Sequence, residues 1–180
     1  MTTLKAPNPP HPRYSTRPFP PYRFILGETP HPTADPEGHS FGKFDEYPGI
    51  LTPENWPTNE MYLYGVDLDN YAYWWEAHEA FEVLWGEFPR GSLESDFLQG
   101  LIKISAAFLK WHMKDHRGVE IHYEGGTGLL SNVAARYPVY MGLDLKAHLE
   151  KLEKHFKAVL AGPGEWPDAL VDYPFIVLRK

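Results

Sequence analysis

Three side chains that can bind a metal ion or move a proton lie close together in the sequence, at His78, Glu79 and Glu82. Residues four apart are neighbours on a helix, so His78 and Glu82 share one face. An imidazole and a carboxylate at this spacing can place two ligands on one ion, by the geometry of His-Glu-x-x-His zinc sites. The metalloprotease motif itself is absent, because its last position is Glu82 here. We predict metal ligation by His78 and Glu82, with Glu79 as the candidate general base or as a group that orients a ligand.

Two further imidazoles, His31 and His39, lie in a loop that is stiffened by three prolines and contains two glycines, residues 30–42. A rigid loop can complete a metal site that begins on a helix. Together with His78 and Glu82 these residues would supply three nitrogens and one oxygen, a set suited to Zn, Fe(II), Mn or Ni, with Zn or Fe expected first. The alternative is that His31 and His39 are turn residues that hydrogen-bond to nearby backbone.

Aromatic and amide side chains surround this candidate site in the sequence. Trp75 and Trp85 fall on the same helical stripe as His78 and are expected to wall a pocket for a small-molecule ligand. Gln99, among the apolar residues of the next predicted helix, is expected to contact a substrate or a bound water. A solvent-facing Gln99 next to Lys103 explains the sequence equally well.

The composition limits the classes of protein that fit. The chain has 180 residues, a net charge of −7, 43% hydrophobic and 23% charged residues, and no cysteine. These values describe one globular domain with room for an extension, and they exclude disulfides, thiolate nucleophiles and cysteine-bound zinc. The negative charge argues against a nucleic-acid partner, and no apolar run predicts a membrane span or a signal peptide. We expect a cytoplasmic protein.

Proline divides the chain into two parts. Thirteen of the 18 prolines lie in residues 1–57, so this part cannot form long helices. Aromatic residues such as Tyr14 and Phe19 are interleaved with them, which favours an irregular strap packed on a helical body over a loose tail. We therefore predict a strap over residues 1–60 and a helical-bundle domain over residues 61–180.

The rest of the chain shows helical patterns. Four main helices are expected, over residues 70–87, 92–114, 118–137 and 145–160. The first has cap candidates at Asp67, Asp69 and Asn70, the second is capped by Ser92 and the fourth by Asp144. The third is interrupted at Gly125-Gly126, and the fourth ends at the stop signal Gly162-Pro163-Gly164. The segment 173–178 is extended and apolar and is expected to pack back on the bundle. The predicted fold class is an all-α bundle with a Pro-rich N-terminal strap.

Two of these helices resemble a known family. The strings HEAFEVLW at residues 78–85 and FLQGLIKISAAFL at residues 97–109 resemble domain-of-unknown-function family 309, small all-helical bacterial and archaeal proteins. Its hallmarks are a His-Glu-x-x-Glu-x-x-Trp helix and a Gln-Gly-Leu-Ile helix, and a looser match follows at residues 125–130. The resemblance covers roughly residues 70–135. It implies an all-helical fold and points to Gln99, but it implies no activity.

Two functions from different classes fit these observations. The first is a metal-dependent enzyme, either a hydrolase that uses metal-activated water on a small molecule or an Fe(II) oxygenase. The second is a non-catalytic helical interaction or oligomerisation module, in which His78 and Glu82 form a buried structural pair and the aromatic residues serve an interface. Self-association into a homo-oligomer is left open by the sequence. The metal content of the purified protein would distinguish the two functions, because only the enzyme requires a bound metal ion.

Overall fold

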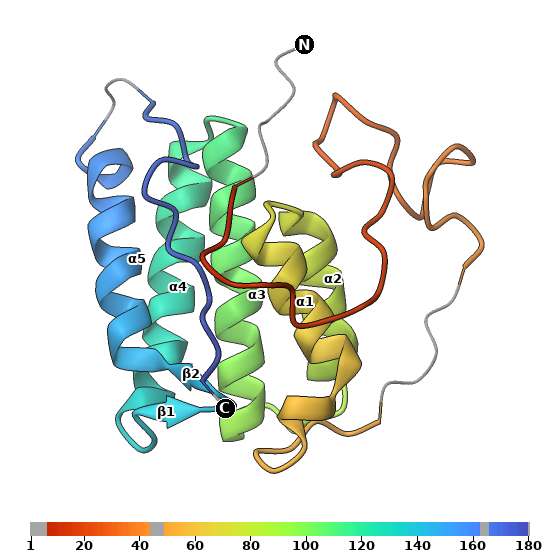
Figure 1. Cartoon of the computed structure of the whole chain (residues 1–180). Coiled ribbons are helices and arrows are strands. Elements are labelled where there is room, and N and C mark those ends of the chain that lie inside the picture. Colours follow the sequence, from red (N-terminus) through yellow and green to blue (C-terminus); the bar gives the residue numbers. More distant parts are fainter. Residues whose placement is uncertain (1–6, 44–48, 163–165, 180) are drawn as a thin grey trace.

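Five helices form the body of the protein, as the computed structural model shows for residues 7–43, 49–162 and 166–179 (Figure 1). Their bounds are α1 Glu60–Asn70, α2 Trp74–Trp85, α3 Leu93–His112, α4 His116–Ala134 and α5 Leu145–Leu160. Consecutive helices pack on one another, α1 on α2, α2 on α3, α3 on α4 and α4 on α5. The predicted all-α bundle is confirmed. None of the helices described by the structure has the length and apolar character needed to cross a lipid bilayer.

The helix α1 corrects the sequence prediction, which placed the first main helix at residues 70–87. Asp67, Asp69 and Asn70 are not caps of α2; they lie in the last turn of α1 and are buried. Their burial is possible because each accepts or donates hydrogen bonds inside the fold. Asp69, for example, accepts from the Ser105 hydroxyl at 2.8 Å. The turn between the two helices passes through Ala72, whose φ is +62°.

An interruption of the third predicted helix was expected at Gly125-Gly126. The prediction is wrong, because both glycines lie inside the continuous helix α4. A Cβ atom at Gly126 would come within 2.9 Å of Ile104 Cδ1, and one at Gly100 within 2.7 Å of the Leu130 side chain. The two glycines therefore let the backbones of α3 and α4 approach closely. The glycines are explained by this packing between helices and not by a local break.

Helix starts agree with the sequence where a side chain caps the backbone. Ser92 accepts from Ser95 N at the start of α3, and Asp144 accepts from Ala147 N at 3.0 Å at the start of α5. The helix α5 ends at Leu160. Of the predicted stop signal, Pro163 and Gly164 lie outside the described residues.

The described segments nearest the two ends of the chain lie against the helices (Figure 1). In the N-terminal segment, the Asp67 carboxylate of α1 accepts from Tyr14 N at 3.0 Å and from Ser15 N at 2.9 Å. In the C-terminal segment, the Asn70 amide both donates to Ile176 O and accepts from Ile176 N, each at 2.8 Å. The extended tail therefore packs back on the bundle, as predicted. Two short strands, β1 (Val139–Tyr140) and β2 (Leu143–Asp144), form a small hairpin. Leu178 of the C-terminal segment forms an isolated antiparallel β-bridge with Leu143 of this hairpin.

Candidate functional site

The helix α2 presents His78, Glu79 and Glu82 outward because its other face is the core. Trp74, Ala77, Phe81 and Leu84 recur at helical spacing and are at most 2% exposed. Burying this stripe against α1 and α3 fixes the rotation of α2 about its axis. Of the polar residues between the stripe positions, His78, Glu79 and Glu82 are left at the surface, whereas Glu76 is buried.

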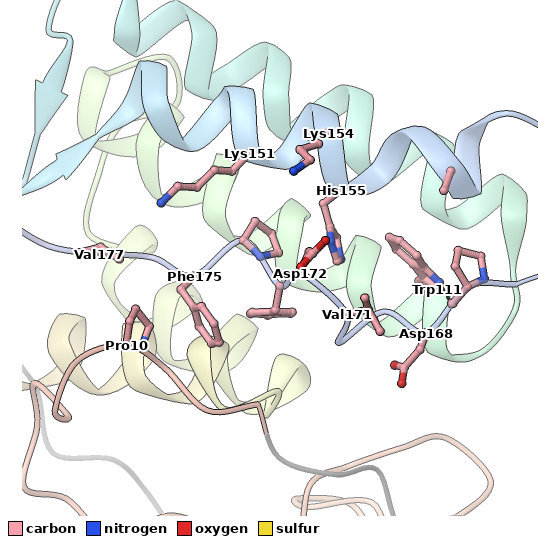
Figure 2. Close-up of a pocket in the computed structure, with 14 residues that line it drawn as sticks. Pro10, Trp111, Lys151, Lys154, His155, Asp168, Val171, Asp172, Phe175 and Val177 are labelled. Carbon is pink, nitrogen blue, oxygen red and sulfur yellow. Dashed lines mark hydrogen bonds between the residues drawn. The ribbon is translucent and has the colours of Figure 1, made fainter.

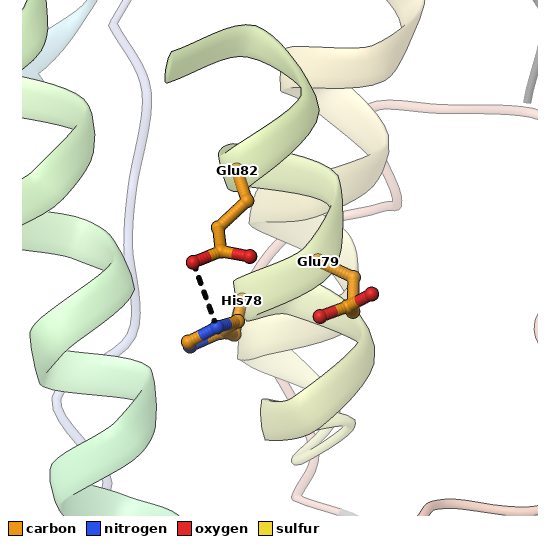
Figure 3. Close-up of side chains that lie close together, drawn as sticks. All are labelled: His78, Glu79 and Glu82. Atoms are coloured by element: carbon orange, nitrogen blue, oxygen red, sulfur yellow. Dashed lines mark ion pairs between the residues drawn. The ribbon is translucent and has the colours of Figure 1, made fainter. Parts of the chain in front are cut away.

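His78 and Glu82 pair across one turn of α2, as their spacing predicts. His78 Nε2 lies 3.2 Å from Glu82 Oε1, and the two side chains are 29% and 46% exposed. One potential ligand atom from each of His78, Glu79 and Glu82 lies within 4.8 Å of the others. Figure 3 shows that Glu79 leaves the helix in a different direction from the other two. Even so, its carboxylate reaches the same cluster.

The imidazole of His39 does not join this cluster. Its Nε2 lies 3.1 Å from Glu76 Oε1, and both side chains are only 5% exposed. Glu76 precedes His78 by two residues, which places the two on nearly opposite sides of α2. His39 therefore meets α2 on a face that His78 does not share.

His31 is also held within its own loop. Its Nδ1 accepts from Ala34 N at 3.2 Å, and its ring lies 5.2 Å from that of Trp75, centroid to centroid. The predicted set of four ligands, His31, His39, His78 and Glu82, is thus not assembled. Among residues 7–43, 49–162 and 166–179, the group whose spacing suits a metal ion is His78, Glu79 and Glu82.

The residues predicted to contact a substrate are spread along the same helices. Trp75 packs against Phe24 and His31 of the N-terminal segment. Trp85 donates from Nε1 to the Ser95 hydroxyl at 2.9 Å, which ties the end of α2 to α3. Gln99 is half-buried on α3. Trp75 and Trp85 therefore have structural contacts at opposite ends of α2, with the polar cluster between them.

His122 of α4 is a neighbour of the site and was not among the predicted site residues. Burial is the main cause that lowers its pKa, and the positive charges of Lys103 and Lys110 and nearby His78 lower it further. Its Nδ1 is shielded from solvent and has no hydrogen-bond partner among the described residues. The signal in the sequence was the spacing of four between His122 and Gly126, since the close approach at Gly126 brings this face of α4 onto α3.

Comparison with known proteins gives one match. The model of the family "Domain of unknown function (DUF309)" matches residues 62–121, from the first turn of α1 to the first turns of α4. No curated protein and no solved structure matches the chain. The match includes His78, Glu82 and Gln99, the residues on which the resemblance was based. Residues 62–121 are therefore similar to the DUF309 family, as the sequence motifs indicated.

Proposed function

We propose that this protein binds a divalent metal ion through His78, Glu79 and Glu82, and that water on this ion hydrolyses a small molecule. The observation that carries the proposal is the approach of three potential ligand atoms to within 4.8 Å of one another. One imidazole nitrogen and two carboxylate oxygens suit Zn, Fe(II) or Mn. The alternative reaction at the same site is oxidation by an Fe(II) oxygenase.

The exposure of the cluster supports a catalytic more than a structural ion. Structural zinc sites surround the ion with four protein ligands, whereas catalytic sites use three and leave a position open. His78 and Glu82 lie at the surface and are 29% and 46% exposed, so water and a small molecule can reach them. A metal held there would supply an activated water. In such a site Glu79 either binds the ion or takes a proton from that water.

His122 of α4 lies within electrostatic reach of His78, and Gln99 lies on α3, which packs on α2; both are candidates to contact a substrate. The lowered pKa of His122 keeps its ring neutral at neutral pH, so it can accept a proton or a hydrogen bond. Lys103, whose ammonium lies over the backbone of Gly125, adds a positive charge between α3 and α4. We place the protein in the cytoplasm, in keeping with its lack of cysteine.

Elemental analysis of untagged protein after reconstitution with Zn, Mn or Fe(II) tests the proposal. We expect close to one equivalent in the wild type and loss of the metal in His78→Ala and Glu82→Gln. Glu153→Gln, an exposed change on α5, is the matched control and should keep the metal. A wild type without metal would refute the proposal. It would favour the non-catalytic module, in which the 3.2 Å contact between His78 and Glu82 is a helix-stabilising pair.

A further inference from the structure

A cavity of about 470 Å³ lies between α5 and the C-terminal segment (Figure 2). The residues of α5 form one wall and residues 167–177 form the other, while Trp111 lies at one end and Pro10 of the N-terminal segment at another. Sites for small molecules commonly measure roughly 300–1,000 Å³. The cavity is thus large enough for a ligand of one or two rings.

The aromatic walls present apolar surface because their polar atoms are bonded within the protein. Trp111 Nε1 donates to Pro167 O at 2.9 Å, and Tyr173 OH donates to Asp69 O at 2.9 Å. His155 Nε2 lies 2.9 Å from Ala169 O. With these bonds made, the rings can offer a ligand only dispersion and ring contacts.

The positive charge at the cavity comes from two lysines of α5. Lys151 and Lys154 extend from the helix over the cavity in Figure 2, and neither forms an ion pair within the part of the chain that the structure describes. An ammonium group without a carboxylate partner at the rim of an apolar cavity can attract an anion. Two such groups at one rim favour a ligand that carries its charge at one end.

The lining of the cavity also contains two aspartates, Asp168 and Asp172. Asp168 accepts from Leu170 N at 2.9 Å, and Asp172 acts electrostatically on His155. Burial is the main cause that lowers the pKa of His155, so its ring is neutral at neutral pH. Neither aspartate forms an ion pair with Lys151 or Lys154 in the part of the chain that the structure describes, so both ammonium groups remain available to a ligand.

We propose that this cavity binds a small anion with a flat apolar body, of the class of aromatic carboxylates, with its rings between the aromatic walls and its carboxylate at Lys151 and Lys154. This binding site is independent of the metal cluster on α2. The lysines select for the charge, and the walls select for a ring system.

Calorimetric titration of the full chain at pH 7.5 tests the proposal with two probes of the same shape, 1-naphthoate and uncharged 1-naphthylmethanol. We expect naphthoate to bind more tightly, by about fivefold, since two partly exposed ion pairs contribute little each. The Lys151→Gln/Lys154→Gln double variant should lose this preference and bind both probes alike. Lys157→Gln, on the same helix but outside the cavity, is the matched control and should keep it.

A second variant tests the location. Ala158 is an exposed position of α5 that lines the cavity, so Ala158→Trp should fill it without disturbing the core. We expect this variant to retain its helical circular dichroism and to lose binding of both probes. The proposal is overturned if naphthoate does not bind, if both probes bind the wild type equally, or if a folded Ala158→Trp binds naphthoate as the wild type does.

Discussion

Two histidine–glutamate pairs on opposite sides of α2 have nearly the same length and different surroundings. His39 Nε2 lies 3.1 Å from Glu76 Oε1, and His78 Nε2 lies 3.2 Å from Glu82 Oε1. Both side chains of the first pair are 5% exposed, whereas His78 is 29% and Glu82 is 46% exposed in the second pair. Distance alone therefore does not separate the two pairs. Burial does, because it decides whether a polar group can exchange its partner for water or for an ion.

The buried pair holds the N-terminal segment on α2. Glu76 Oε1 accepts from Phe24 N at 2.7 Å as well as from His39, so one carboxylate oxygen serves two points of the segment. Arg23 lies near enough to act on Glu76 electrostatically, which offsets part of the cost of burying the carboxylate. The exposed pair has no such task. Its geometry follows from two residues of one helix, and it is open to a metal ion.

Removing the buried carboxylate should have the largest effect. We expect Glu76→Ala to lower the free energy of unfolding by about 3 kcal/mol, because it leaves the Phe24 N–H and the His39 ring buried without their acceptor. Urea denaturation measures this loss, and limited proteolysis between residues 25 and 43 reports release of the segment. Glu82→Ala should change stability by no more than about 0.5 kcal/mol. Equal losses in the two variants would contradict the contrast.

A buried imidazole without any partner sharpens the comparison. His148 of α5 is 3% exposed, and neither ring nitrogen has a hydrogen-bond partner among the described residues. Burial, with a smaller contribution from Lys151, lowers the pKa of His148 to about 4 from its ordinary value of 6.5. The folded state thus holds the neutral ring, and the unfolded state binds the proton first as the pH falls.

The stability that depends on neutral His148 is complete above pH 6.5 and is lost as the pH falls toward 4. From the lowered pKa we expect about 3 kcal/mol of this loss between pH 7 and pH 4. The variant His148→Leu lacks the titrating group and should not lose this stability. Between pH 7 and pH 4, the unfolding free energy of the wild type should therefore fall by about 3 kcal/mol more than that of the variant. Urea denaturation at the two pH values measures it. A difference that does not depend on pH would show that His148 does not titrate in this way.

Metal addition should separate the two pairs in the opposite sense. At a free Zn²⁺ concentration of about 100 times the dissociation constant, binding to the folded state alone stabilises it by about 2.7 kcal/mol. We expect this gain in the wild type and in His39→Gln, and its absence in Glu82→Gln. Thermal unfolding with and without the metal measures the gain. Retention of the gain in Glu82→Gln would place the bound metal elsewhere on the protein.

Salt gives the smallest predicted effect. A double-mutant cycle on His78 and Glu82 at pH 6 should yield a coupling energy of about 0.5 kcal/mol that falls by a few tenths in 1 M NaCl, because exposed charges are screened. The same cycle on His39 and Glu76 should change less with salt, because solvent does not reach that pair. A coupling of the exposed pair that resists salt would show that it is more enclosed than its accessible area indicates.

The sequence determined the features that arise within one helix. The helices α3 and α5 begin where Ser92 and Asp144 cap them, and His78 meets Glu82 because residues four apart are neighbours on any α-helix. These contacts depend on backbone geometry over one turn, so spacing alone predicts them. The motifs of residues 78–85 and 97–109 likewise sufficed to indicate the family whose model matches residues 62–121.

The tertiary structure decided which distant groups meet. It paired His39 with Glu76 rather than with His78, it placed His122 beside the site, and it buried the acidic last turn of α1, which reads as a set of caps in the sequence. Spacing could not predict these outcomes, because each depends on which face of a helix is covered by another segment. The packing of the whole core decides which face of each helix is covered. It fixes both the close approach of α3 and α4 at Gly100 and Gly126 and the rotation of α2 about its axis.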